Sequence, residues 1–231
     1  MLKAEAQWVG RSLRQLPSDA ISPLLNVGSS TGEFRRTVQP WIAQEIFNPL
    51  AERGVAVDHL DVKEGEGIDL HGDLMDGSFV NGLSTRGYRS LLCCNLLEHV
   101  HDRSLISARL ECLVPAGGYL IITVPREFPF HADPIDTMFR PSPEEIAHLF
   151  QGCRLVGGEI LDCGQGWDYV DRNPLRLLSN VTRRLLARKE GGGIKGTTSF
   201  APWLFRTFRQ SCVVLQRCGS QDYVDSGMTE G

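Results

Sequence analysis

The sequence predicts an α/β domain built on a doubly wound, mostly parallel sheet with helices on both faces. Two observations carry this expectation. Short apolar runs alternate with helical stretches along most of the 231 residues, which is the pattern of strands joined by crossover helices. The first run, residues 24–27, ends at a glycine turn between Gly28 and Gly32, and a helical segment follows it.

The first half of the chain is predicted to hold four strands. Residues 24–27 read as a buried strand, and residues 33–53 as a helix interrupted near Pro40 and Pro49 and ended by Gly54. Further apolar runs predict strands over 55–62, 67–70 and 88–95, and a helix over 102–113 follows them.

The second half continues the alternation. A turn over 115–118 leads into a strand over 119–124. Ser142 as N-cap and Pro143 in the first turn predict a helix that ends near Gln151. Strands are expected over 153–161 and 211–217, with a well-capped helix over 173–189 between them.

Polar or glycine residues follow four of the predicted strands. They are Gly28 to Gly32, Asp61, residues 95–98 and residues 125–131. Ligands of open α/β sheets bind at the carboxyl ends of the strands, so we expect these segments to form one crevice. The N–H groups of the helix after the glycine turn are expected to face a carboxylate, a ribose or a phosphate. The nicotinamide fingerprint fails at its second and third glycines, and a P-loop is absent.

Bulk composition excludes several function classes. The net charge of −4 is not that of a general nucleic-acid binder. Seven cysteines without a C-x-x-C pair predict free thiols in a reducing compartment, and no metal site is expected. The beginning of the sequence has no signal-peptide pattern, and no apolar run approaches the about 20 residues that span a bilayer, so a cytoplasmic protein is predicted.

Taken together, residues 24–161 resemble the class I S-adenosylmethionine-dependent methyltransferases, in the group that carries a Leu-Glu-His-Val segment, here residues 97–100. The resemblance implies a Rossmann-like fold and S-adenosylmethionine as cofactor. Two departures stand out: Ser30 replaces a common middle glycine, and Ala116 is inserted in the Pro-Gly-Gly turn.

The resemblance also implies a cofactor role for particular residues. The glycine loop would lie against the methionine moiety, Asp61 would hold the ribose, and Asp58 is the alternative if the strand ends earlier. Asp73 and Leu74 would lie by the adenine, and Asn95 beside the methionine moiety. The implied cofactor residues are therefore Gly28, Ser29, Gly32, Asp61, Asp73, Leu74 and Asn95.

The best candidates for a general base follow the fifth predicted strand. His131 has a suitable ordinary pKa, and Asp133 or Asp136 would orient it. The alternative is that these residues only fix a loop, with Asp136 paired to Arg140. His99 is the second candidate, near the transferred methyl group or, alternatively, bonded to backbone at a helix start. Glu98 is as consistent with a structural role as with a cofactor-facing one, and His59 and His101 are expected at the surface.

One domain over residues 1–218 is predicted, with a core of about 22–165, an insertion of about 166–209 and a disordered tail over 219–231. The basic helix of the insertion and the aromatic stretch after it are consistent with contact to a membrane or a lipid-linked substrate through residues 172–208. The alternative is a helix that only covers the substrate side of the pocket.

The predicted function is methyl transfer from S-adenosylmethionine to a small molecule or a sugar or glycan precursor, at oxygen. The nucleic-acid alternative is disfavoured because no Asn/Asp-Pro-Pro-Tyr/Phe motif follows the fourth strand. The rival hypothesis is a non-catalytic methyltransferase-fold protein that acts as a binding or regulatory module.

Overall fold

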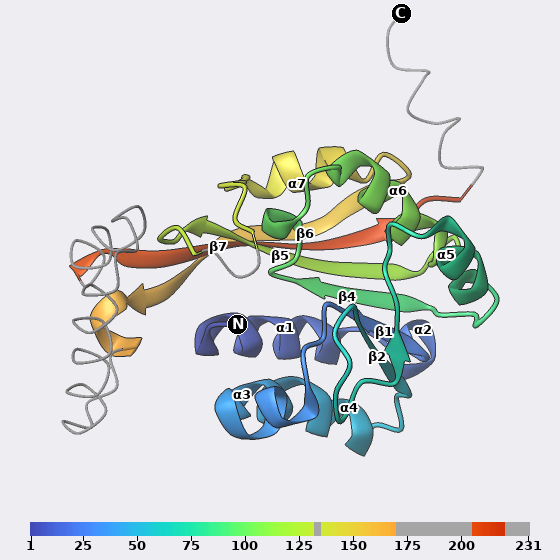
Figure 1. The fold of residues 1–231 in the computed structure, drawn as a ribbon, viewed down its shortest axis with the longest axis horizontal. Coiled ribbons are helices and arrows are strands. Elements are labelled where there is room, and N and C mark those ends of the chain that lie inside the picture. Colours follow the sequence, from blue (N-terminus) through green and yellow to red (C-terminus); the bar gives the residue numbers. More distant parts are fainter. Residues whose placement is uncertain (132–134, 170–204, 220–231) are drawn as a thin grey trace, which may run out of the picture.

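The computed structural model describes residues 1–131, 135–169 and 205–219. Seven strands form one sheet in the order β3-β2-β1-β4-β5-β7-β6 (Figure 1). The first five strands pair in parallel, and β7 is antiparallel to both β5 and β6. The bounds are β1 Leu24–Val27, β2 Val57–Asp61, β3 Leu70–His71, β4 Ser90–Cys94, β5 Tyr119–Glu127, β6 Cys153–Gln165 and β7 Thr207–Arg217. The predicted doubly wound, mostly parallel sheet is confirmed.

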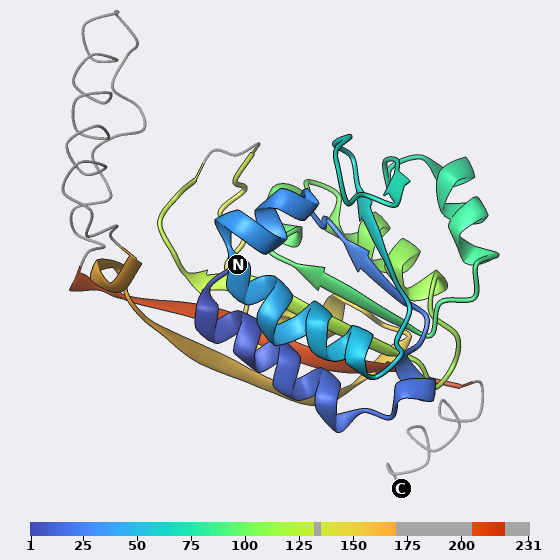
Figure 2. The same cartoon turned by 90° about the horizontal axis from the view of Figure 1, so that it is seen from below.

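Helices cover both faces of this sheet (Figures 1 and 2). One face carries α5 (Gly77–Ser84), α6 (Arg103–Cys112) and α7 (Pro143–Leu149). The other carries α1 (Lys3–Gln15), α2 (Ser18–Ile21), the π-helical η1 (Phe34–Val38) and η2 (Ala43–Phe47), α3 (Pro40–Ile42) and α4 (Asn48–Glu52).

The central strands β1, β4 and β5 bury side chains on both faces, which explains why they read as largely apolar runs. On β4, Leu91 and Cys93 belong to the core under α5, α6 and α7. Leu92, between them, belongs to the core under α1 and α4. This alternation follows from the two-residue period of a strand.

The α-helices α1, α2 and α5 were not predicted from the sequence, and glycines explain why α1 and α5 were missed. In α1, Gly10 interrupts the helical pattern, yet a Cβ at this position would lie 2.1 Å from the carbonyl oxygen of Glu45. Gly10 therefore lets α1 approach η2 closely. The other helix, α5, contains two glycines and depends on the carboxylate of Asp76, which accepts hydrogen bonds from the N–H groups of Ser78 and Phe79.

The predicted helix over 33–53 is broken at only one of its two prolines. A bend at Gln39 precedes Pro40, as expected, but the helix continues through Pro49. Residues 43–47 are π-helical. Proline at position 49 has no N–H to donate to the carbonyl of Glu45, four residues earlier. That carbonyl accepts a hydrogen bond from Arg14 instead. The break near Pro49 was thus a wrong prediction.

Several strand bounds differ from the predicted ones. The third strand lies at Leu70–His71 rather than over 67–70, and β5, β6 and β7 are longer than predicted. The predicted helix over 173–189, most of the predicted insertion and all but residue 219 of the predicted tail lie outside the described residues. Within the described part of the chain, no helix combines the length and the apolarity needed to cross a bilayer.

Candidate functional site

A cavity of about 640 Å³ opens at the carboxyl ends of β1, β2 and β4. Three of the four predicted polar segments reach it. Of the seven predicted cofactor residues, those that line it are Gly28, Ser29, Asp61, Asp73, Leu74 and Asn95. Gly32 is the exception.

The glycine loop is held from behind by a buried arginine. Arg35, from η1, donates hydrogen bonds to the carbonyls of Ser29, Ser30 and Gly67, and so joins the loop to the segment after β2. Gly28 has a φ of +66°, and a Cβ there would lie 3.3 Å from Leu96 Cδ1. Both facts favour glycine at this turn. Arg35 was missed by the sequence analysis because nothing in a polar helix marks one arginine as buried.

The helix after this loop is a poorer anion site than expected. The N–H of Gly32 donates to the carbonyl of Glu66 at 2.7 Å, and the N–H of Phe34 donates to Thr31 Oγ1 at 3.2 Å. Two of the N–H groups expected to face a ligand are therefore already bonded within the protein.

Asp61 ends β2 and is 9% exposed. Its Oδ2 accepts from the N–H of Ser30 at 2.7 Å, and its Oδ1 accepts from the N–H of Lys63 at 3.0 Å. Each oxygen keeps a second acceptor position, so the carboxylate can receive two hydroxyl groups in a fixed orientation. The alternative, Asp58, accepts from the Tyr88 hydroxyl and does not line the cavity.

The wall beyond Asp61 is formed by the segment after β3. Gly72 donates its N–H to the carbonyl of Asp61 at 3.1 Å, and a Cβ on Gly72 would lie 2.4 Å from the Phe79 ring. Asp73 Oδ1 accepts from the N–H of Met75 at 2.8 Å, which fixes the turn that presents Leu74 to the cavity.

Asn95, at the end of β4, has a φ of +52°. Its Nδ2 donates at 2.7 Å to Oε1 of Glu5, a fully buried carboxylate on α1. The same oxygen accepts from Thr123 Oγ1 at 2.6 Å. The N-terminal helix therefore positions a residue of the cavity wall, a contact between residues too distant in sequence to be predicted.

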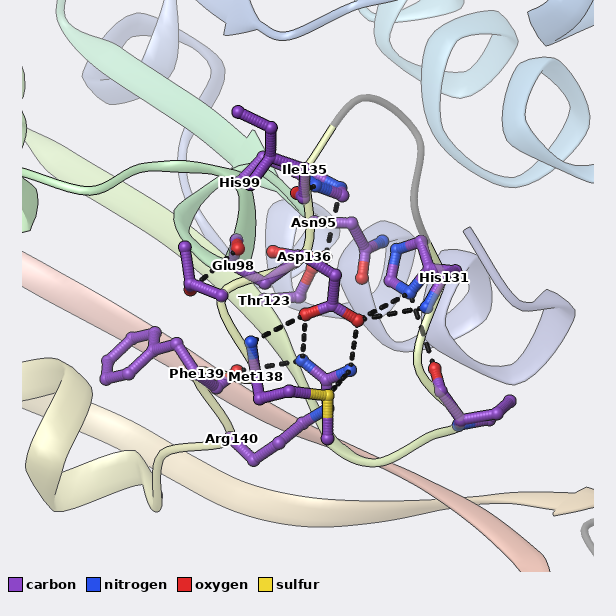
Figure 3. A network of polar contacts seen from close by, with 12 residues as sticks. Asn95, Glu98, His99, Thr123, His131, Ile135, Asp136, Met138, Phe139 and Arg140 are labelled. Carbon is purple, nitrogen blue, oxygen red and sulfur yellow. Dashed lines mark hydrogen bonds and ion pairs between the residues drawn. The ribbon is translucent and has the colours of Figure 1, made fainter. Parts of the chain in front are cut away.

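A second cluster of polar side chains lies at the rim of the cavity (Figure 3). The rings of His99, which lines the cavity, and His131 have centroids 5.1 Å apart. His99 Nδ1 donates to the carbonyl of Ile135. The predicted alternative for His99, a backbone contact at a helix start, is therefore present together with its position at the cavity.

Asp136 anchors the loop that carries His131. Its carboxylate accepts from Arg140 at 2.7 Å and from the backbone N–H of His131 at 3.1 Å, and it lies 3.2 Å from His131 Nδ1. Hydrogen bonds from Arg140, His131 and Met138 lower the Asp136 pKa to about 2, against an opposing effect of burial. Burial lowers the pKa of His131. Asp136 thus makes both contacts that the sequence analysis left as alternatives, whereas Asp133 lies outside the described residues.

Glu98 lies under this cluster with its side chain fully buried. Among the described residues, neither of its oxygens has a hydrogen-bond partner. Burial raises its pKa to about 8. Its Oε1 lies 3.8 Å from His99 Nε2, too far for a hydrogen bond.

We compared the chain with protein-family models, curated proteins and solved structures. No family model matches the chain, and no curated protein matches it. Among solved structures, a methyltransferase from Archaeoglobus fulgidus that depends on S-adenosylmethionine is 14% identical with a TM-score of 0.55, over 92% of this chain and 94% of that one. Coclaurine N-methyltransferase, solved with N-methylheliamine and S-adenosylhomocysteine, is 13% identical with a TM-score of 0.57, over 93% of this chain and 70% of that one. The chain therefore has the fold of the class I S-adenosylmethionine-dependent methyltransferases.

Proposed function

We propose that the protein binds S-adenosylmethionine in the 640 Å³ cavity and transfers its methyl group to an oxygen atom of a small molecule or a sugar or glycan precursor. The observation that carries the proposal is the pairing of Asp61 with Gly28 and Gly72 around one cavity at the carboxyl ends of the strands.

The cavity suits the cofactor in size and in donor chemistry. Its volume lies within the about 300–1,000 Å³ of typical ligand sites. Asp61 retains acceptor positions for the two ribose hydroxyls, and Leu74 offers an apolar surface to the adenine. Gly28 and Gly72 both line the cavity, at positions where a Cβ would crowd Leu96 and the Phe79 ring.

Methyl transfer itself is expected to depend mainly on how the protein positions the two reactants. The cofactor supplies an electrophilic sulfonium methyl group, and the protein aligns an acceptor with it. With the cofactor bound, the acceptor oxygen would displace the sulfur from the methyl carbon, and the hydroxyl proton would pass to a nearby base or to solvent. His99 and His131, at the rim, are the residues placed to act on that hydroxyl.

An acceptor oxygen is favoured by this imidazole pair, since a hydroxyl needs activation and an amine can react without it. The preference for a small or sugar acceptor rests on the acidic composition and the missing Asn/Asp-Pro-Pro-Tyr/Phe motif. The fold itself is compatible with other acceptors, because coclaurine N-methyltransferase shares it.

The test is calorimetric titration with S-adenosylhomocysteine. We expect one site in the wild-type protein. Asp61→Ala should weaken it about 10- to 100-fold, since hydrogen bonds to a charged group contribute about 1.5–3 kcal/mol. His131→Ala is the matched control and should bind normally, because His131 does not line the cavity. Normal binding by Asp61→Ala would refute the assigned pocket, and absence of binding by the wild-type protein would favour the non-catalytic module.

A further inference from the structure

Glu98, His99 and His131 form a cluster beside the proposed cofactor site, in which the proposed function gives a role to the two histidines and none to Glu98. Each offers one potential ligand atom, and these atoms lie within 4.8 Å of one another. Glu98 and His99 come from the segment after β4, and His131 comes from the segment after β5 (Figure 3). Because 31 residues separate the two histidines, the sequence offered no metal-ligand spacing to recognise.

The hydrogen bonds around the two rings leave a nitrogen of each available. Nδ1 of His99 contacts the carbonyl of Ile135, and Nδ1 of His131 contacts the Asp136 carboxylate and, at 3.4 Å, the carbonyl of Pro129. All three partners are acceptors, so both Nδ1 atoms carry the proton and both Nε2 atoms keep a lone pair. Metal-bound histidines show this arrangement, in which a carboxylate or carbonyl fixes the far side of the ring.

The buried carboxyl group of Glu98 points to a metal ion independently of the two histidines. The group is fully buried, has no hydrogen-bond partner among the described residues and faces His99 Nε2. A buried carboxyl group without a partner is costly, and the cost is offset when it ligates a cation. The hydrogen bonds described for Glu98 are made by its backbone carbonyl. That carbonyl accepts from the N–H of Thr137 at 2.9 Å and from the hydroxyl of Thr137 at 2.8 Å. These bonds fix the backbone of Glu98 and leave its side chain available for a ligand.

We propose that Glu98, His99 and His131 bind one divalent transition-metal ion at the rim of the cavity. Two imidazoles and one carboxylate suit Zn²⁺, Co²⁺, Mn²⁺ or Fe²⁺ better than Mg²⁺ or Ca²⁺, which prefer oxygen ligands. To bind one ion, each of the three ligand atoms needs to move about 1 Å toward a common centre, because the metal–ligand bonds are about 2.0–2.2 Å long. The ion would hold both Nε2 atoms and would itself activate the acceptor hydroxyl in place of the two imidazoles. The site therefore deepens the proposed function and rests on it for its role, although not for its existence.

The test uses untagged, metal-free protein and Co²⁺ as the probe, followed by its visible absorption and by calorimetry. One ion per chain is expected, and Mg²⁺ at the same concentration should not displace it. Glu98→Gln, which keeps the shape and removes the charge, should weaken Co²⁺ at least tenfold, and so should His131→Ala. The control is His71→Gln, because His71 forms another histidine–glutamate pair, 3.4 Å from Glu64 and exposed.

Each outcome discriminates. Absence of Co²⁺ binding, or binding that Glu98→Gln and His131→Ala leave unchanged, overturns the site. Equal loss in His71→Gln shows adventitious surface binding and overturns it as well. Titration of the same samples with S-adenosylhomocysteine separates the two proposals. Cofactor binding without Co²⁺ binding refutes the metal site alone, and Co²⁺ binding without cofactor binding refutes the proposed function alone.

Discussion

His59 shows how strongly the environment of a single residue departs from what its sequence neighbours suggest. It was expected at the surface, but its ring packs edge-on against Phe47 with centroids 4.7 Å apart. Its Nδ1 accepts from Asn26 Nδ2 at 3.0 Å. Phe47 and Asn26 both line the cavity, so His59 supports its floor from outside. Burial and the nearby Arg35 lower the His59 pKa to about 4.

This pKa makes stability depend on pH. Below the ordinary pKa of 6.5 the unfolded chain takes up a proton that folded His59 refuses, so stability falls between pH 6.5 and 4. We expect His59→Gln to remove about 2 kcal/mol of this loss, allowing for the partial exposure of the ring. Urea unfolding of wild type and variant at pH 7 and at pH 4 measures this loss in the free energy of unfolding. An equal loss in wild type and variant would contradict the assigned pKa.

At the scale of elements, α1 is held to the sheet by one carboxylate as well as by its apolar face. Glu5 accepts from Asn95 and Thr123 through one oxygen and from the N–H of Leu2 through the other. Trp8, on the same helix, is 8% exposed. These contacts connect the start of the chain to the end of β4 and to the middle of β5.

Removal of this carboxylate should loosen both α1 and the cavity wall. Glu5→Ala leaves the side-chain donors of half-buried Asn95 and buried Thr123 without an acceptor, so we expect a loss of about 3 kcal/mol in the free energy of unfolding. Arg11→Ala, on the exposed face of α1, is the control and should change stability by less than about 0.5 kcal/mol. Denaturant unfolding of both variants makes the comparison. A loss no larger in Glu5→Ala than in Arg11→Ala would show that α1 is held by apolar packing alone.

The elements also show what the sequence was able to predict. The strands and the helices of the alternating pattern were recognised because period and capping are local signals, as at Ser142, whose side chain accepts from the N–H of Glu145. The cavity residues followed because the carboxyl ends of parallel strands share an edge. Contacts between distant segments were not predictable. No local sequence pattern indicates that Arg35 or Glu5 is buried, or that the side chains of Glu98 and His131 lie close together.

For the whole molecule, the seven cysteines differ in exposure. Buried positions are Cys93, Cys163 and Cys212, half-buried ones are Cys94, Cys153 and Cys218, and Cys112 is exposed. None of the seven, all within the described residues, forms a disulfide. Burial raises the pKa of Cys153 and Cys163 to about 12, and it also raises the pKa of Cys93, Cys94 and Cys212. Thiols with so little thiolate, and shielded from solvent, react only when the structure opens.

Thiol labelling therefore measures opening of the entire domain. At neutral pH, a maleimide should label Cys112 rapidly, the half-buried Cys94, Cys153 and Cys218 more slowly, and the three buried cysteines only as the protein unfolds. Cys112→Ser should abolish the fast phase. S-adenosylhomocysteine at 100 times its dissociation constant stabilises the folded state by about 2.7 kcal/mol, so the three buried thiols should together slow about 100-fold. Protection of Cys94 alone, the one cysteine that lines the cavity, would instead show that the ligand merely covers its site and that the two cores open independently of it.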